Sequence, residues 1–113
     1  MKLALGTAQF GLDYGISNKT GQTTARDAQA IVALAQDSGV DVIDTSPAYG
    51  NSEAVLGRIV PPGFGRLITK TPRFAEREIS RGTLDNLTSS VKASLASLGR
   101  NNIYGLLVHG ARD

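Results

Sequence analysis

Apolar and polar positions along the chain follow two different periods, which predicts strands alternating with helices. Short aliphatic and β-branched runs, typical of buried strands, lie at residues 3–6, 40–44, 66–70 and 104–109. Between successive runs, apolar residues recur three and four positions apart, as in amphipathic helices, at residues 24–38, 52–60 and 84–98. The predicted order β-α-β-α-β-α-β indicates an α/β fold with parallel strands and right-handed crossovers.

The predicted helices have local boundary signals. Thr24 and Asp27 form a Ser/Thr-x-x-acid capping box at the start of the first helix. Gly39 and Gly99 follow the first and third helices, where a left-handed C-cap residue is expected, and Pro61 stops the second helix. The apolar stripes expected to face the sheet are Ala28, Ile31, Val32 and Ala35, then Ala54, Val55, Leu56 and Ile59, and finally Leu84, Leu87, Val91, Leu95 and Leu98.

A glycine-rich stretch at residues 6–15 follows the first predicted strand. It is not a phosphate loop, because it lacks the G-x-G-x-x-G pattern and no helix is predicted directly after it. We expect it to form the first loop of the fold and to edge a substrate pocket through Phe10 or Tyr14.

Composition narrows the class of protein. The 113 residues are 41% hydrophobic and 19% charged, which is ordinary for one soluble globular domain. The net charge is +2 and the basic residues are scattered, so no nucleic-acid partner is expected. The loop 73–81 interleaves arginines with Glu76 and Glu78, which predicts a solvated segment rather than an anion site.

The chain also lacks signals for membranes and metals. No apolar run approaches the roughly 18 residues of a membrane span, and residues 1–5 form too short a run for a secretion signal. We therefore expect a cytoplasmic protein with no membrane partner. The absence of cysteine and the single histidine argue against disulfides and metal sites.

Ionisable side chains stand at the ends of three predicted strands. Asp44, Lys70 and His109 each close one strand, and Tyr49 lies in the loop after Asp44. The carboxyl ends of parallel strands meet at one edge of a sheet, where chemistry gathers in such folds. Taken singly, each residue has an ordinary structural role, but together they predict a proton-handling cluster.

The chemistry of this predicted cluster suits a carbonyl group. A neighbouring Lys70 ammonium would lower the pKa of Tyr49 and make its hydroxyl a usable general acid. Asp44 could hold that ammonium by a charge-assisted hydrogen bond, and His109 could donate to a carbonyl oxygen and orient it. Such a site stabilises negative charge developing on oxygen, as hydride addition to an aldehyde or ketone requires.

These residues stand in stretches that resemble the N-terminal half of an aldo/keto reductase. The most specific element is Asp44 placed five positions before Tyr49. The matching stretches together span nearly the whole chain: 5–7, 39–53, 68–70, 94–99 and 106–109. The opening segment 9–15 is similar to bacterial members of the family, some of them encoded with sugar-modifying enzymes.

The resemblance implies an oxidoreductase with a defined tetrad. Tyr49 would be the proton donor, Lys70 its pKa tuner, Asp44 the partner of Lys70, and His109 the residue that orients the substrate. The implied cofactor is a nicotinamide dinucleotide, usually NADPH, with Gly6, Thr7 and Asp44 near its nicotinamide end. The implied substrate is a small carbonyl or sugar-like compound.

The family barrel has eight βα units, whereas this sequence predicts four strands and three helices. We therefore expect residues 1–113 to form the N-terminal half of a (β/α)8 TIM barrel, from a truncated or partial reductase. A catalytically incomplete half-barrel that self-associates, with a homodimer completing the barrel, is an alternative. Another is a carbonyl lyase or aldolase in which Lys70 forms a Schiff base.

Overall fold

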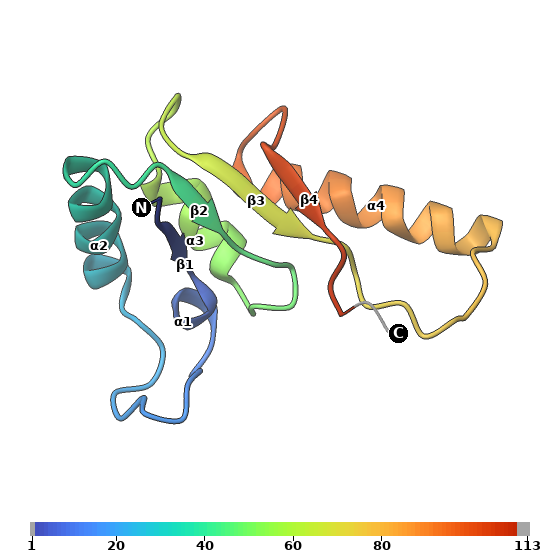
Figure 1. Cartoon of the computed structure of the whole chain (residues 1–113), viewed down its shortest axis with the longest axis horizontal. Coiled ribbons are helices and arrows are strands. Elements are labelled where there is room, and N and C mark those ends of the chain that lie inside the picture. The colour runs from blue at the N-terminus through green and yellow to red at the C-terminus, as the bar shows by residue number, and fades with distance from the viewer. Residues whose placement is uncertain (1, 111–113) are drawn as a thin grey trace.

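Four parallel strands, paired in chain order, form the centre of the fold (Figure 1). The structure is a computed structural model that describes residues 2–110. Its elements are β1 (Ala4–Gly6), α1 (Ala8–Gly11), α2 (Ala25–Asp37), β2 (Val42–Asp44), α3 (Ser52–Ile59), β3 (Arg66–Lys70), α4 (Arg81–Leu98) and β4 (Gly105–Leu107). The predicted parallel α/β architecture is confirmed.

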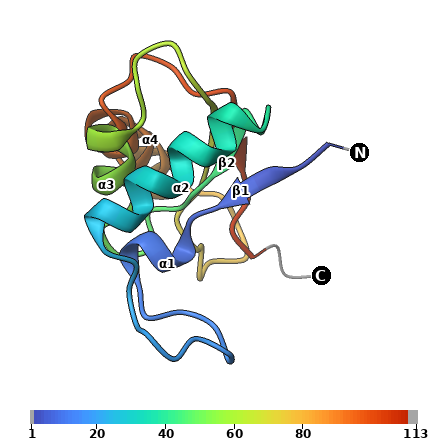
Figure 2. The same ribbon diagram turned by 90° about the vertical axis from the view of Figure 1, so that its left-hand side faces the viewer.

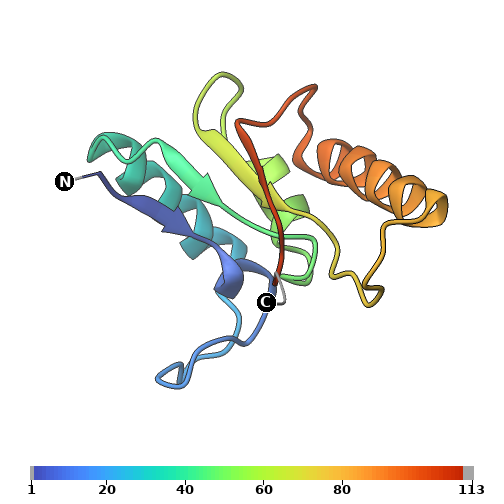
Figure 3. The same cartoon turned by 45° about the vertical axis from the view of Figure 1, so that its right-hand side comes forward.

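The three longer helices, α2, α3 and α4, lie on one side of the sheet (Figures 2 and 3). Crossovers of one hand between successive neighbouring strands place every helix on the same face, as in part of a closed barrel. The strand register sets Leu5, Ile43 and Leu67 side by side. Ile43 and Leu67 are buried in the core between sheet and helices, together with Val32, Val55, Leu56 and Leu98.

The helix boundaries largely agree with their sequence signals. Thr24 is the N-cap of α2, and its side chain accepts a hydrogen bond from the backbone N of Asp27 at 3.2 Å. Gly39 and Gly99 adopt positive φ values of 74° and 61° just after α2 and α4, where a side chain would be strained. α3 ends at Ile59, two residues before Pro61.

The glycine-rich stretch contains a difference from the prediction. Ala8–Gly11 forms the short helix α1, so the described chain has four helices rather than the predicted three. Phe10, expected to edge a substrate pocket, is instead buried in the core. A single helical turn that starts directly after β1 turns this side chain inward, and periodicity cannot detect so short an element.

Two predicted apolar stripes are only partly covered. Ile31 in α2 and Leu84 in α4 are exposed, although both were expected to face the sheet. α2 buries the narrower stripe Ala28, Val32 and Ala35, and the first turns of α4 extend beyond the sheet (Figure 1). None of the helices in residues 2–110 combines the length and apolar character needed to cross a bilayer.

Candidate active site

The four predicted site residues lie at or just beyond the carboxyl ends of the parallel strands β2, β3 and β4. Asp44 and Lys70 are the last residues of β2 and β3. Tyr49 lies in the loop between β2 and α3, and His109 lies two residues after the end of β4. The predicted end of β4 at His109 is therefore two residues too long.

Asp44 and Lys70 form a closely coupled ion pair. The Lys70 Nζ donates to Asp44 Oδ1 and Oδ2 at 2.8 and 2.7 Å and to the carbonyl oxygen of Thr45 at 2.9 Å. The Lys70 side chain is only 13% exposed and that of Asp44 is 30% exposed, so the pair is largely shielded from water on the Lys70 side. These three acceptors match the three protons of the ammonium. Lys70 therefore acts on its surroundings through its charge rather than through a spare donor.

Tyr49 lies between the ion pair and His109. The Lys70 Nζ is 5.1 Å from the centroid of the Tyr49 ring, within the range of a cation–π contact. The Tyr49 and His109 rings meet edge to face, with centroids 6.1 Å apart and an interplanar angle of 74°. The structure thus brings the four predicted side chains into one cluster.

The Tyr49 loop is held by backbone contacts against α1. The Tyr49 N donates to the Ser46 carbonyl oxygen, and the Ser52 N donates to the Tyr49 carbonyl oxygen, both at 3.0 Å. A Cβ atom on Gly11 would collide with the Tyr49 carbonyl, and one on Gly50 would collide with the Gly11 carbonyl. Two glycines therefore allow a close approach of backbones that fixes the position of Tyr49.

A layer of buried hydroxyl groups lies beneath the cluster, and the sequence reasoning missed it. Ser52 Oγ lies 2.9 Å from both the carbonyl oxygen and Oγ1 of Thr7, and 3.1 Å from Thr45 Oγ1. Thr69 Oγ1 donates to the buried carboxylate of Glu53 at 2.6 Å. These contacts tie the ends of β1, β2 and β3 to α3. The available signal was the concentration of small hydroxyl residues directly beside Asp44 and Lys70.

His109 has polar partners that were also not predicted. Its Nδ1 lies 3.0 Å from Ser46 Oγ, and its backbone N donates to Thr71 Oγ1 at 3.1 Å. An Arg73 guanidinium nitrogen lies 3.4 Å from Nε2. Burial, followed by the positive charges of Arg73 and Lys70, lowers the pKa of His109 below 6.5, with Asp44 opposing the shift. The imidazole is therefore neutral at pH 7.

A cavity of about 360 Å³ opens beside this cluster. Its lining includes Gly6, Thr7, Gln9, Tyr14, Asp44 and Tyr49. The three residues proposed for the nicotinamide end of a cofactor, Gly6, Thr7 and Asp44, therefore border the same space as Tyr49. Tyr14 edges this space as expected, whereas Phe10 does not.

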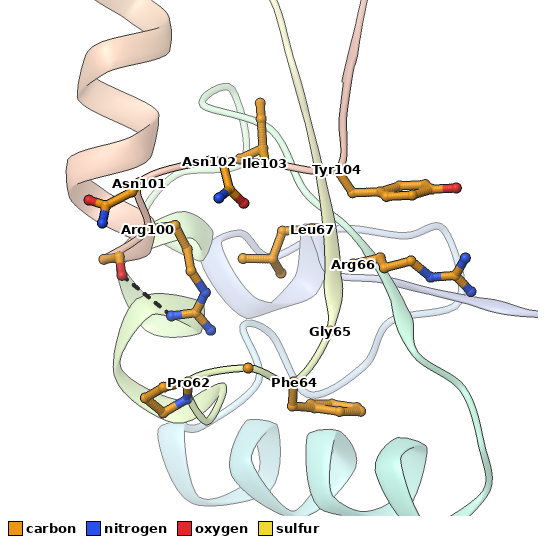
Figure 4. Close-up of a pocket in the computed structure, with 12 residues that line it drawn as sticks. Pro62, Phe64, Gly65, Arg66, Leu67, Arg100, Asn101, Asn102, Ile103 and Tyr104 are labelled. Carbon is orange, nitrogen blue, oxygen red and sulfur yellow. Dashed lines mark hydrogen bonds between the residues drawn. The ribbon is translucent and has the colours of Figure 1, made fainter.

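A second, larger cavity of about 690 Å³ lies at the opposite end of the strands, between the segments 62–67 and 99–104 (Figure 4). Its two guanidinium groups already have partners: Arg66 bonds Asp41 at 2.7 Å, and Arg100 donates to the Val60 and Pro61 carbonyl oxygens at 3.2 Å. The lining contains no carboxylate and no imidazole. The smaller cavity is therefore the better candidate for proton chemistry.

Comparisons with known proteins agree with this geometry. The model of the aldo/keto reductase family matches residues 2–111. A crystal structure assigned to an aldo-keto reductase from Pseudomonas aeruginosa is similar with a TM-score of 0.78 and 32% identity, covering 95% of this chain and 42% of that one. A second solved structure with the same assignment and organism has a TM-score of 0.76 and 31% identity, covering 95% and 40%.

A curated relative is more distant and much longer. The oxidoreductase sirO of Leptosphaeria maculans is 29% identical over 110 residues, which make up 95% of this chain and 32% of that protein. The chain thus spans about a third of the curated relative and about two fifths of the solved structures. Its parallel sheet corresponds to part of an aldo-keto reductase TIM barrel, as expected. By sequence match and by structure, the chain belongs to the aldo/keto reductase family.

Proposed function

We propose that the protein carrying this chain reduces an aldehyde or ketone to an alcohol, with Tyr49 as the general acid. The observation that carries the proposal is the shielded Asp44–Lys70 pair, whose ammonium lies 5.1 Å from the Tyr49 ring. The substrate class is a small carbonyl or sugar-like compound. Family membership supports an oxidoreductase of this kind.

Each residue of the cluster has a distinct part in the proposed reaction. Tyr49 gives its hydroxyl proton to the carbonyl oxygen as negative charge develops there. The Lys70 ammonium stabilises the resulting phenolate by its charge, and Asp44 keeps that ammonium in place. His109, neutral at pH 7, donates a hydrogen bond to the carbonyl oxygen and orients the substrate.

The residues beside the smaller cavity fit the nicotinamide–ribose end of NADPH, the proposed cofactor. The backbone at Gly6 leaves open space, because a Cβ there would meet no heavy atom within 4 Å. Thr7 supplies shape alone, since its N, carbonyl oxygen and Oγ1 all lie in hydrogen bonds within the protein. The Asp44 carboxylate is available to a ribose hydroxyl. When bound, the reduced nicotinamide supplies the hydride.

The contacts of Lys70 disfavour the Schiff-base alternative. An amine that attacks a carbonyl must first lose a proton, whereas three acceptors surround the Lys70 Nζ and stabilise its charged form. Borohydride reduction in the presence of a carbonyl substrate should therefore leave no adduct on Lys70. A trapped adduct at this residue would favour the lyase.

Replacement of Tyr49 tests the proposed function directly. In the complete protein, Tyr49→Phe should lower kcat by about 10²-fold or more and leave the cofactor Kd nearly unchanged, because the hydroxyl acts only in the chemical step. Tyr104→Phe is the matched control, since Tyr104 is exposed at the opposite end of the sheet. Near-normal turnover in Tyr49→Phe would require another proton donor and would reject the proposal.

The edge strand β4 supports a second proposal, concerning assembly. Tyr104, Leu106, Leu107 and Val108 are all exposed along this strand and its flanks. Exposed apolar strand edges recruit partners, so we propose that the 113-residue chain on its own pairs with a second copy of itself. Sedimentation equilibrium should detect a dimer. A chain that stays monomeric and soluble at micromolar concentration would contradict this.

A further inference from the structure

Ser46 is a fully buried hydroxyl residue between the Tyr49 loop and His109. It lies two residues after β2, and its side chain has no exposed surface. Within residues 2–110, Ser46 Oγ has two hydrogen-bonding neighbours: the backbone N of Ala48 at 3.1 Å and His109 Nδ1 at 3.0 Å. Ser46 lies within the stretch 39–53 that resembles the reductase family, but the sequence analysis gave it no role.

The hydrogen count at Ser46 Oγ defines the direction of its bond to His109. The Ala48 N–H can only donate, so it occupies one lone pair of the hydroxyl oxygen. The hydroxyl proton is buried and needs an acceptor, because an unpaired buried donor is costly. Of the two neighbours, only His109 Nδ1 can accept a hydrogen bond from this hydroxyl. Ser46 therefore donates to Nδ1.

We propose that Ser46 is a positioning residue that holds His109 in the tautomer with its single ring proton on Nε2. A neutral imidazole carries one N–H, so a ring that accepts at Nδ1 must donate at Nε2. This inference rests on the proposed function, in which His109 donates a hydrogen bond to the substrate carbonyl oxygen. The opposite tautomer would present a lone pair at Nε2 and repel that oxygen.

The Arg73 contact favours the opposite tautomer. Its guanidinium can only donate, so a hydrogen bond across the 3.4 Å to Nε2 would require a lone pair on that nitrogen. The buried Ser46 hydroxyl has no other acceptor within residues 2–110 and therefore decides the tautomer, whereas the exposed Arg73 can turn to water. Its positive charge meanwhile opposes protonation of the ring and keeps His109 a neutral donor.

The competing explanation is purely structural. Ser46 Oγ accepts from the Ala48 N–H in a local turn, and this contact alone could account for a hydroxyl residue here. Under that explanation, loss of the hydroxyl would weaken the loop but would leave the tautomer of His109 unchanged. The two explanations therefore differ in a property that can be measured on the ring itself.

Nitrogen NMR of the imidazole tests the proposal without turnover. His109 is the single histidine of the 113-residue chain, so that ¹⁵N-labelled chain gives one pair of ring nitrogen signals, and in the complete protein His109→Gln identifies the pair by its loss. Above the titration of the ring, Nε2 should show the shift of a protonated nitrogen and Nδ1 that of an acceptor. Ser46→Ala should lower the ratio of the Nε2–H to the Nδ1–H tautomer about three- to tenfold, the effect of one net hydrogen bond.

Two further variants separate the ring contact from general stability. Thr71→Val removes the hydroxyl that accepts from the His109 backbone and should leave the tautomer ratio as in the wild type. Ser46→Thr keeps a hydroxyl and should restore the wild-type ratio. If Ser46→Ala does not fold, the wild-type spectrum still decides, because a protonated Nδ1 would overturn the proposal.

Outcomes for the tautomer and for the reaction remain distinguishable. An unchanged ratio in folded Ser46→Ala would show that Ser46 only supports the loop, whatever the reaction. Normal turnover in Tyr49→Phe would instead remove the proposed function and leave the tautomer measurement standing. If both proposals hold, Ser46→Ala should also lower kcat/KM in proportion to the fraction of the donor tautomer, and so by less than the three- to tenfold fall in the tautomer ratio.

Discussion

Each end of the β2–β3 pair carries an ion pair with the same N···O distance, yet the two ion pairs differ in how exposed they are to water. At the carboxyl end Lys70 meets Asp44, and at the amino end Arg66 meets Asp41, each with a closest N···O distance of 2.7 Å. The Lys70 and Asp44 side chains are 13% and 30% exposed, whereas those of Arg66 and Asp41 are 43% and 52% exposed. Distance alone does not distinguish a site from a surface contact.

The difference lies in what surrounds each pair. Lys70 has a third acceptor in the Thr45 carbonyl and an aromatic neighbour in Tyr49, above a layer of buried hydroxyl groups. Arg66 also packs on an aromatic ring, that of Tyr104 at 5.1 Å, but both groups are open to water. Water screens the exposed pair, so its charges have little effect on neighbours. Because the carboxyl-end pair is more buried, its charges act more strongly on neighbouring groups.

Matched substitutions at the two aspartates should give the largest contrast. Asp44→Asn removes the charge that holds the Lys70 ammonium, so turnover of the complete protein should fall about 10²-fold or more. Asp41→Asn removes an exposed partner of Arg66 and should change turnover less than about twofold. Steady-state kinetics on both variants checks this. Equal losses would mean that the amino-end pair supports the site through the fold.

The cluster at the carboxyl end was predictable because two of its residues close the hydrophobic runs of β2 and β3. Hydrophobic runs locate β2 and β3, and parallel pairing brings their last residues, Asp44 and Lys70, to one edge. The Tyr49 position follows from its place in the loop after β2. The chemistry of these side chains suggested their roles, and family resemblance then added the cofactor and the substrate class.

Contacts that depend on register and loop path were not predictable. Thr7 and Ser52 meet across 45 positions, and Ser46 and His109 across 63, with no local signal that pairs them. The turn of α1 was missed because four residues are too few to show a helical period. The close approach of Gly11 to the Tyr49 loop was missed because a glycine in sequence does not reveal what its absent side chain would meet.

Two helical glycines offer a smaller contrast that tests whether the Tyr49 loop must be held closely. Gly11→Ala pushes a Cβ into the Tyr49 carbonyl, so it should reduce the free energy of unfolding by about 1–3 kcal/mol. A Cβ on Gly82 would meet only Ser80 Oγ, at an ordinary contact distance of 3.6 Å, so Gly82→Ala should increase the free energy of unfolding by about 0.5–1 kcal/mol, since alanine favours helices. Urea unfolding measures both.

Measuring kcat of the same two variants shows whether the displaced loop also affects catalysis. Because Gly11→Ala displaces the loop that carries Tyr49, its kcat should fall even at temperatures where the variant is fully folded. Gly82→Ala should keep its kcat, since α4 lies outside the cluster. Normal kcat in a destabilised Gly11→Ala variant would show that the loop tolerates displacement and that its close packing serves stability alone.

The smallest expected effects concern acid stability, and they again separate the two ends. Burial and neighbouring positive charge lower the pKa of His109 below 6.5, and the hydrogen bond from Arg66 lowers the pKa of Asp41 below 3.8. In both cases the unfolded chain binds the proton more readily than the folded chain, so acidification destabilises the fold. The windows differ: the His109 loss begins near pH 6.5, and the Asp41 loss begins near pH 3.8.

Urea unfolding across this pH range should therefore reveal two separate losses. His109→Gln should remove the first, because glutamine has no proton to bind in that window. Asp41→Asn should remove only a small part of the second, and high salt should hide even that part, because the Arg66–Asp41 pair is exposed. A first loss that survives in His109→Gln would mean that another group titrates near neutral pH. A salt-resistant contribution from Asp41 would show that the amino-end pair is more shielded than its exposure indicates.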